Sequence, residues 1–164
     1  PELELKDDRP GVRFGDGRKH SETNASASGE FVCNIVCSAQ ASVMNATSAH
    51  LPAGTSEAQQ AGIAMVPSQK VKTPRVAACP AALECIFLEA RPVPKRGGKH
   101  RYQMVFGEVV GIHIDDRYVQ AGRVDTAAMQ LLTRLGYDEY AVLEKTFAMS
   151  RPDNDPILDG ALKS

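Results

Sequence analysis

The sequence predicts a mainly β protein with peripheral helices, folded as a closed or split antiparallel barrel. Many strand-like runs are separated by short turns, whereas the helix-like runs are brief. The longest strand-like run, residues 102–115, carries glycines at positions 107 and 111. Glycines inside a strand are typical of bends or bulges, which curve a sheet around a barrel corner.

The first predicted elements are a short strand over residues 11–14, a short helix and a longer strand. Ser21 is a suitable N-cap, residues 25–28 allow one or two helical turns, and Gly29 can end them in a left-handed conformation. Residues 31–38 then alternate between two faces, which predicts a strand.

Further strands are expected between short helices in the rest of the chain. Ser56 begins a capping-box pattern for a brief helix that stops at Gly62. The run at 82–93 is apolar on both sides, as expected for a strand packed inside a barrel or against another subunit. The other expected strands are 71–76 and 102–115, and the other expected helices are 39–49, 126–135 and 138–145.

Length and composition fit one domain over residues 1–150 and a tail at 151–164. The 164 residues include 43% hydrophobic and 24% charged residues, with a net charge of −1. Because the basic residues are scattered, no nucleic-acid surface is expected, and the basic run 95–101 is interpreted as a hairpin tip. No apolar run approaches the roughly 18–20 residues of a membrane span, and these residues contain no signal peptide.

The four cysteines have the spacing of neither a metal site nor a disulfide framework. Cys33 and Cys37 would lie about 13 Å apart along one strand, too far to bridge. We expect buried, reduced cysteines in a cytoplasmic protein, and no metal ligands.

Small hydroxyl side chains gather at the start of the first predicted helix. The first turn of a helix offers unpaired N–H groups and the positive end of the dipole, and Lys19, Ser21 and Thr23 add a charge and hydroxyl donors. This arrangement is suited to a phosphate. Most hydroxyl-rich helix starts are only caps, however, and the pattern by itself favours that simpler interpretation.

The order of several motifs changes that balance. The chain resembles the flavin reductase-like family of FMN-binding split β-barrel proteins, of the flavoredoxin and nitrilotriacetate monooxygenase component B type. The motifs that carry the resemblance are KHSETN (19–24), GEFVCN (29–34), MNAT (44–47), PRV (74–76), ALEC (82–85), GEVVGIHID (107–115), RLG (134–136) with Tyr140, and the terminal Phe147 and Arg151-Pro152. The family's Asp and Thr after the lysine are His20 and Ser21 here, which keeps a hydroxyl and replaces an acid.

The resemblance implies a six-stranded type of Greek-key barrel that binds FMN. It assigns the FMN phosphate to Lys19, Ser21, Thr23 and Asn24. Asn34 could contact the edge of the flavin ring or equally hold a neighbouring turn, and Asn45 and Thr47 are candidates for binding or for packing. Family members usually carry two more strands before Pro1, so we expect an N-terminal part to be missing from these residues.

The function implied by the resemblance is an NAD(P)H-dependent flavin reductase, an oxidoreductase that transfers hydride from NAD(P)H to flavin. It could serve as the reductase component of a two-component monooxygenase. The alternative is an FMN-binding electron carrier without nicotinamide oxidation, and a third reading is a catalytically silent interaction protein. No Rossmann fingerprint or P-loop is present, and no catalytic side chain is identified, because hydride transfer is the chemistry of the cofactor.

Two carboxylates and one histidine in the strand-like runs are weaker candidates for a role in the functional site. Glu84 and Glu108 could form a functional acid pair, although pairing with arginines is the more frequent outcome. His113 is expected to be structural, with contact to the flavin as the minor alternative. The apolar strand around residues 83–88 and the family's habit of placing flavin near a subunit interface favour a homodimer.

Overall fold

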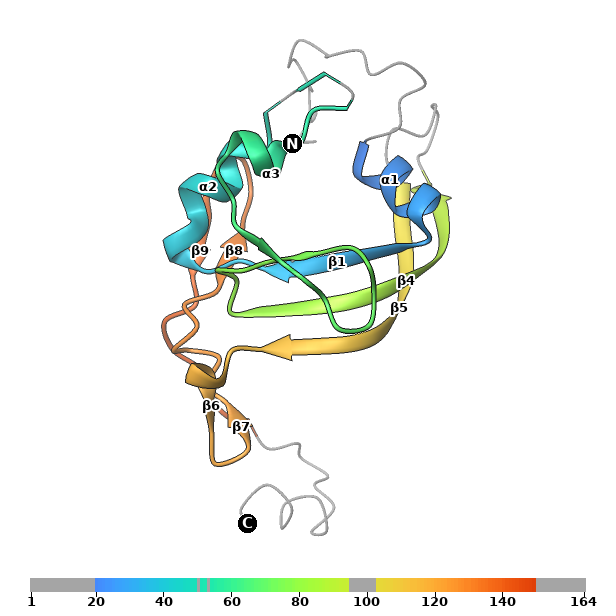
Figure 1. The fold of residues 1–164 in the computed structure, drawn as a ribbon. Helices are drawn as coiled ribbons and strands as arrows, with labels where there is room; N and C mark the ends of the chain where they lie inside the picture. Colours follow the sequence, from blue (N-terminus) through green and yellow to red (C-terminus); the bar gives the residue numbers. More distant parts are fainter. Residues whose placement is uncertain (1–19, 50, 53, 95–102, 150–164) are drawn as a thin grey trace.

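The computed structural model describes residues 20–49, 51–52, 54–94 and 103–149, and Figure 1 shows how they are arranged. Its centre is a three-stranded antiparallel sheet in the order β1-β4-β5. The three strands are β1 (Glu30–Ile35), β4 (Ala81–Pro92) and β5 (Gln103–Ile114). The other described ladders are also antiparallel and the helices are short, so the predicted mainly β class is confirmed.

The two long strands lie where the sequence predicts them, and the interior glycines mark irregular pairing. The β4–β5 register shifts twice, once beside Gly111 and once beside Gly107. A Cβ atom at Gly107 would lie 2.5 Å from an atom of the Phe31 ring. Glycine therefore permits a bulge nearby and also makes room for the Phe31 ring on β1.

The best-buried residues of the sheet lie on β4 and just before it. Pro80 is fully buried, and Ala82 and Cys85 are only 1% and 3% exposed. The strand is not apolar on both sides as expected, because Glu84 is buried in it at 2% exposure and Leu88 is 60% exposed.

One face of this sheet is crossed by the segment from β2 (Met65–Val66) to β3 (Arg75–Val76) (Figure 1). The two short strands pair with each other, antiparallel. The strand predicted over 71–76 is thus reduced to its last two residues. The rest of the segment is held by side chains from the sheet below it, as described in the next section.

The helices at the periphery are shorter or differently placed than the sequence predicts. Helix α1 (His20–Ser28) is longer than the predicted turns at 25–28. Because it begins at His20, the prediction that Ser21 is its N-cap is wrong, and Ser21 lies in the first turn. Gly29, with φ of 73°, follows the helix in the left-handed conformation, as predicted.

The strand predicted over 31–38 is shorter than expected, and the helix predicted over 39–49 is divided into two parts. Strand β1 ends at Ile35, and Cys37 instead forms an isolated bridge with Leu131. The following turn divides into a 3-10 helix, η1 (Ser38–Gln40), and α2 (Ala41–Ala46). Helix α3 (Glu57–Gln60) is capped as predicted, because the Ser56 side chain accepts a hydrogen bond from Gln59 N–H at 3.3 Å.

The C-terminal part of the described chain contains short strands, and the last two of them lie where helices were predicted. Its elements are η2 (Asp116–Tyr118), β6 (Val119–Gln120), β7 (Arg123–Val124), β8 (Leu132–Arg134) and β9 (Tyr140–Val142). The predicted helices at 126–135 and 138–145 are therefore wrong. Gln130, inside the first predicted helix, has a φ of 49°, which a right-handed helix cannot contain. Within the second predicted helix, Tyr140–Val142 instead form β9, which pairs with β8. Met129 is buried at 4% exposure, and it lies in a turn.

Other sequence predictions concern residues outside the described part of the chain. These are the strand at 11–14, the hairpin tip at 95–101, the tail at 151–164 and the contribution of Lys19. Among the described residues, no helix is long and apolar enough to cross a membrane.

All four cysteines are free thiols. Cys37, Cys79 and Cys85 are buried as predicted, whereas Cys33 is exposed. Burial raises the pKa of the Cys79 and Cys85 thiols, which keeps them protonated and weakly reactive.

Candidate functional site

Three of the four predicted phosphate ligands lie on α1, and Lys19 lies outside the described residues. Ser21, Thr23 and Asn24 are all exposed. The hydroxyls of Ser26 and Ser28, further along the helix, donate instead to the backbone carbonyls of Thr23 (3.1 Å) and Asn24 (2.8 Å). The N–H groups of the first helical turn have no partner within a helix. The exposed start of α1 is thus a set of hydrogen-bond donors suited to an anion.

A buried acceptor lies in the same turn. Among the described residues, Oε2 of Glu22 is buried and has no hydrogen-bond partner. A buried carboxylate oxygen without a donor is unfavourable, and it is well suited to accept from a hydroxyl group.

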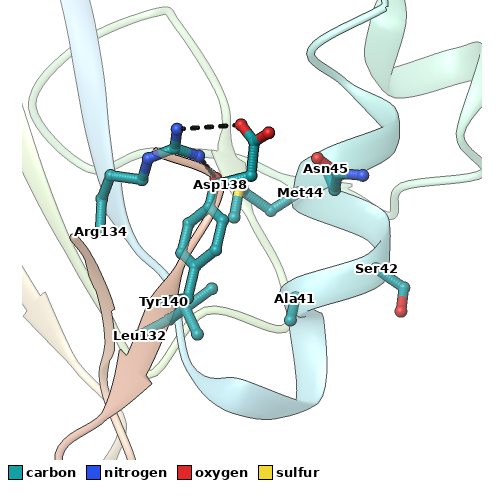
Figure 2. A pocket seen from close by; sticks show the side chains of 8 residues that line it. All are labelled: Ala41, Ser42, Met44, Asn45, Leu132, Arg134, Asp138 and Tyr140. Atoms are coloured by element: carbon teal, nitrogen blue, oxygen red, sulfur yellow. Dashed lines mark hydrogen bonds and ion pairs between the residues drawn. The ribbon is translucent and has the colours of Figure 1, made fainter. Parts of the chain in front are cut away.

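The predicted residues of α2 and its C-cap behave differently from each other. The Thr47 hydroxyl donates to the Met44 carbonyl at 2.7 Å, a local bond within the last helical turn. Asn45 is exposed and lines a pocket between α2 and the β8–β9 hairpin (Figure 2). The packing interpretation therefore describes the Thr47 hydroxyl, whereas Asn45 is available to a ligand.

The pocket beside Asn45 has a volume of about 480 Å³ and holds a guanidinium group. Its lining, drawn in Figure 2, is Ala41, Ser42, Met44, Asn45, Leu132, Arg134, Asp138 and Tyr140. The Arg134 guanidinium donates to the Tyr140 hydroxyl at 2.7 Å and to the Tyr137 carbonyl. It also stacks on the Tyr140 ring, 4.8 Å from the ring centre. These contacts fix the guanidinium at the pocket wall.

Sequence reasoning did not include Arg134 and Tyr140 among the site residues. Both belong to motifs quoted for the family resemblance, so a signal was present. Their proximity to Asn45 depends on the β8–β9 hairpin, which brings Arg134 opposite Tyr140. The helices predicted for this region hid that arrangement.

The structure does not bring all the described candidate ligands into one place. Helix α1 precedes β1 and α2 follows it, so the two lie toward opposite ends of that strand (Figure 1). The six residues of β1 span about 20 Å at the usual rise of a strand. A single ligand could contact both groups only if it extended along the sheet.

Asn34 is engaged inside the protein. Its Oδ1 accepts a hydrogen bond from Val76 N–H at 2.8 Å, which corresponds to the second of its two predicted roles, holding a neighbouring turn. On the same strand, Glu30 Oε1 accepts from the N–H (2.6 Å) and the hydroxyl (3.1 Å) of Thr73. Both side chains of β1 therefore hold the segment that crosses the sheet.

Glu84 completes this set of contacts from β4. One of its oxygens accepts from Lys70 N–H at 2.6 Å, and both lie within 3.1 Å of Gln69 N. The hydrogen bond from Gln69 N–H is the main cause of a lowered pKa of Glu84, and the bonds from Lys70 and Val71 and the nearby Arg75 charge act in the same direction against the effect of burial. Glu84 is thus a carboxylate kept ionised inside the protein by backbone donors.

Within the described part of the chain, neither Glu84 nor Glu108 has the partner that the sequence predicts, which is either the other carboxylate or an arginine. Glu84 is hydrogen-bonded by backbone N–H groups, and Arg75 makes only a minor electrostatic contribution. Glu108 is exposed and pairs in register with Ile86, so it faces no burial cost and forms no pair with Glu84. His113 is half-buried and lies opposite Ala82 on β4.

Among the described residues, no group of three or more His, Cys, Asp or Glu side chains is arranged to hold a metal ion.

Comparison with known proteins gives a family match over most of the chain. The model of the flavin reductase like domain matches residues 9–132. This range contains α1, the whole central sheet and α2, and it ends at the first residue of β8.

Individual relatives agree with this match. An uncharacterized protein from Deinococcus radiodurans is 36% identical over 146 residues, which cover 87% of this chain and 62% of the relative. The crystal structure of nitrilotriacetate monooxygenase component B from Bacillus cereus superposes with a TM-score of 0.74 and 27% identity, over 80% of this chain and 65% of that one. A Shewanella frigidimarina protein with a flavin reductase split barrel domain gives a TM-score of 0.70 at 22% identity, over 80% and 65% of the two chains.

These comparisons show the fold to be a split barrel of the flavin reductase-like type. The chain spans less than two thirds of the length of each of the three proteins.

Proposed function

Because the chain belongs to the flavin reductase-like domain family, we propose that it binds FMN and transfers hydride from NAD(P)H to flavin. A flavin-related redox role is supported by the family and by the similarity to nitrilotriacetate monooxygenase component B. The observation that supports FMN binding is the exposed donor set of α1, which lies within the family match.

The residues of α1 fit a flavin mononucleotide. Lys19, Ser21, Thr23 and Asn24 would bind the 5′-phosphate, helped by the N–H groups of the first turn. The unpaired Oε2 of Glu22 would accept from a hydroxyl of the ribityl chain, which lies next to the phosphate in FMN. Exposed donors for an anion and an unpaired acceptor for a hydroxyl thus lie in the same helical turn.

The roles of the other predicted ligands follow their positions. Asn45 would contact the flavin or the molecule that reacts with it, because it is exposed at the pocket of α2. Thr47 and Asn34 would act mainly through the backbone that they hold. When bound, FMN would supply the hydride-accepting chemistry, and this chain would supply binding, orientation and exclusion of water.

Reduction by a nicotinamide separates the reductase from the electron carrier. Protein expressed from its complete gene and loaded with FMN is mixed anaerobically with NADH and, separately, with NADPH, while the flavin absorbance band is followed. Bleaching within seconds supports the reductase. A bound flavin that bleaches only with dithionite contradicts hydride transfer from nicotinamide and supports the carrier. A protein that binds no FMN at all contradicts both.

A homodimer and a monooxygenase partner are part of the same proposal. Ile112, Leu88 and Val109 are 66%, 60% and 47% exposed on the central sheet, and a second copy could cover these apolar side chains. The free thiols suit a reducing, cytoplasmic location. Sedimentation giving a monomer at micromolar concentration would contradict the dimer.

A further inference from the structure

We propose that the pocket between α2 and the β8–β9 hairpin binds a small organic carboxylate, with Arg134 as its anion-binding residue. Two arginines of the chain, Arg117 and Arg134, each lie beside an aspartate and a tyrosine, and they differ in how fully the aspartate neutralises them. The proposal deepens the proposed function, because Asn45 belongs to the same pocket and a carboxylate held there would lie near any flavin that Asn45 contacts.

The charge of Arg117 is neutralised by the carboxylate of Asp115 at short range. Its Nε lies 3.1 Å from each carboxylate oxygen of Asp115, and its Nη2 lies 2.7 Å from Oδ2. The pairing is strong enough to lower the pKa of Asp115 to about 2. The guanidinium also lies over the Tyr118 ring at 5.6 Å. A guanidinium paired in this way has little capacity left for a second anion.

Arg134 has the same kinds of neighbours but a much weaker carboxylate contact. Its Nη2 lies 3.5 Å from Oδ1 of Asp138, whose side chain is fully exposed, while the Arg134 side chain is half exposed. Its short contacts go to neutral oxygens of Tyr140 and Tyr137. The guanidinium is therefore held in place without having its charge neutralised at short range, as an anion-binding group requires.

The pocket around Arg134 suits an organic anion better than a bare ion. Its volume of about 480 Å³ falls in the usual range for small-molecule sites, about 300–1,000 Å³. Met44, Leu132 and Ala41 give it apolar walls, whereas Ser42 and Asn45 add neutral hydrogen-bonding groups (Figure 2). Asp138 places a negative charge on one side of the pocket. A bound carboxylate would displace the Asp138 side chain from Arg134 or bind on the side of the guanidinium away from it.

Benzoate and benzamide form a matched pair of probes, because they share size and shape and differ in charge. Binding to the purified protein, without flavin or nicotinamide, is measured by saturation-transfer NMR and calorimetry. We expect benzoate to bind at least about tenfold more tightly than benzamide, and Arg134→Gln to remove most of that preference. Arg117→Gln is the matched control and should leave benzoate affinity unchanged.

A second variant gives a gain that misfolding cannot imitate. Asp138→Asn removes the competing carboxylate, so benzoate affinity should rise by about two- to fivefold. The proposal is wrong if benzoate and benzamide bind equally, if neither binds, or if Asp138→Asn weakens benzoate.

Two further outcomes separate this proposal from the phosphate site on α1. Inorganic phosphate that displaces benzoate at comparable concentration would overturn the preference for an organic carboxylate. If Arg134→Gln lowered FMN affinity while riboflavin affinity stayed constant, the pocket would be the phosphate site, and the carboxylate proposal would fail. If the FMN-loaded wild-type protein does not oxidise NAD(P)H but the purified protein still prefers benzoate, the proposed function is wrong and the carboxylate site stands.

Discussion

Helix α1 and the central sheet both carry polar side chains from the family motifs, but the two sets have different surroundings. Ser21, Thr23 and Asn24 are exposed at the start of a helix. Asn34 and Glu84 lie in the sheet and accept hydrogen bonds from the backbone of the crossing segment. A polar residue in a motif can thus be available to a ligand or fully used by the fold, and the following experiments test that distinction.

The largest effect is expected from Glu84→Ala. Removing the buried carboxylate leaves the N–H groups of Gln69 and Lys70 without their acceptor and creates a small cavity. We expect the free energy of unfolding to fall by about 3–5 kcal/mol, measured by urea denaturation.

Glu108→Ala on β5 is the control for this substitution. It removes an exposed carboxylate from the neighbouring strand, so its effect should stay within about 0.5 kcal/mol. Equal effects of the two substitutions would show that the crossing segment is not held through Glu84.

The same carboxylate predicts a pH dependence. Backbone donors lower the pKa of Glu84 below its ordinary value of 4.5, so the folded state favours the ionised form more than the unfolded chain does. Its contribution to stability is therefore complete above the unfolded pKa and is lost as the pH falls through the folded pKa. Urea denaturation of the wild type should show a steeper loss of stability below about pH 4.5 than Glu84→Gln. Parallel profiles would contradict the assignment.

The next effect tests the exposed side of the comparison. Replacing both Ser21 and Thr23 by Ala should remove two charge-assisted hydrogen bonds to the FMN phosphate, each worth about 1.5–3 kcal/mol. FMN affinity, measured by fluorescence quenching, should fall by at least about tenfold. Riboflavin affinity and stability should hardly change, because neither side chain is buried. Equal losses for FMN and riboflavin would place the phosphate elsewhere.

How far the sequence predicts this structure depends on the range of the interactions involved. The β4 and β5 strands, the stop at Gly29 and the cap at Ser56 follow from local periodicity and backbone preference, and each is present. The helix expected over 126–135 is absent because Gln130 adopts a left-handed conformation, and the helix expected over 138–145 is replaced by pairing of β9 with β8. The apolar spacing reveals neither.

Contacts between distant residues account for the rest. The acceptor role of Glu84 depends on a segment fifteen residues earlier, since its partner is the backbone of Gln69. Arg134 reaches the pocket of Asn45 only because the β8–β9 hairpin folds back toward α2 (Figure 2). Backbone N–H groups carry no residue signature, so no motif could have identified Gln69 and Lys70 as the partners of Glu84.

The smallest effect is expected at Asn34, which is both a candidate ligand and a residue that the fold uses. It was predicted as a flavin ligand or as a support for a turn, and its Oδ1 accepts from Val76 N–H at 2.8 Å. Asn34→Ala should lower the free energy of unfolding by about 1–2 kcal/mol, since one backbone donor loses its acceptor. Asn34→Asp retains an acceptor oxygen and should preserve more of the stability. If Asn34 acts only through the fold, FMN and riboflavin affinities should change by less than about twofold in Asn34→Asp. A loss of affinity for both flavins in Asn34→Asp, with stability retained, would show that the amide contacts the flavin ring as well as the turn.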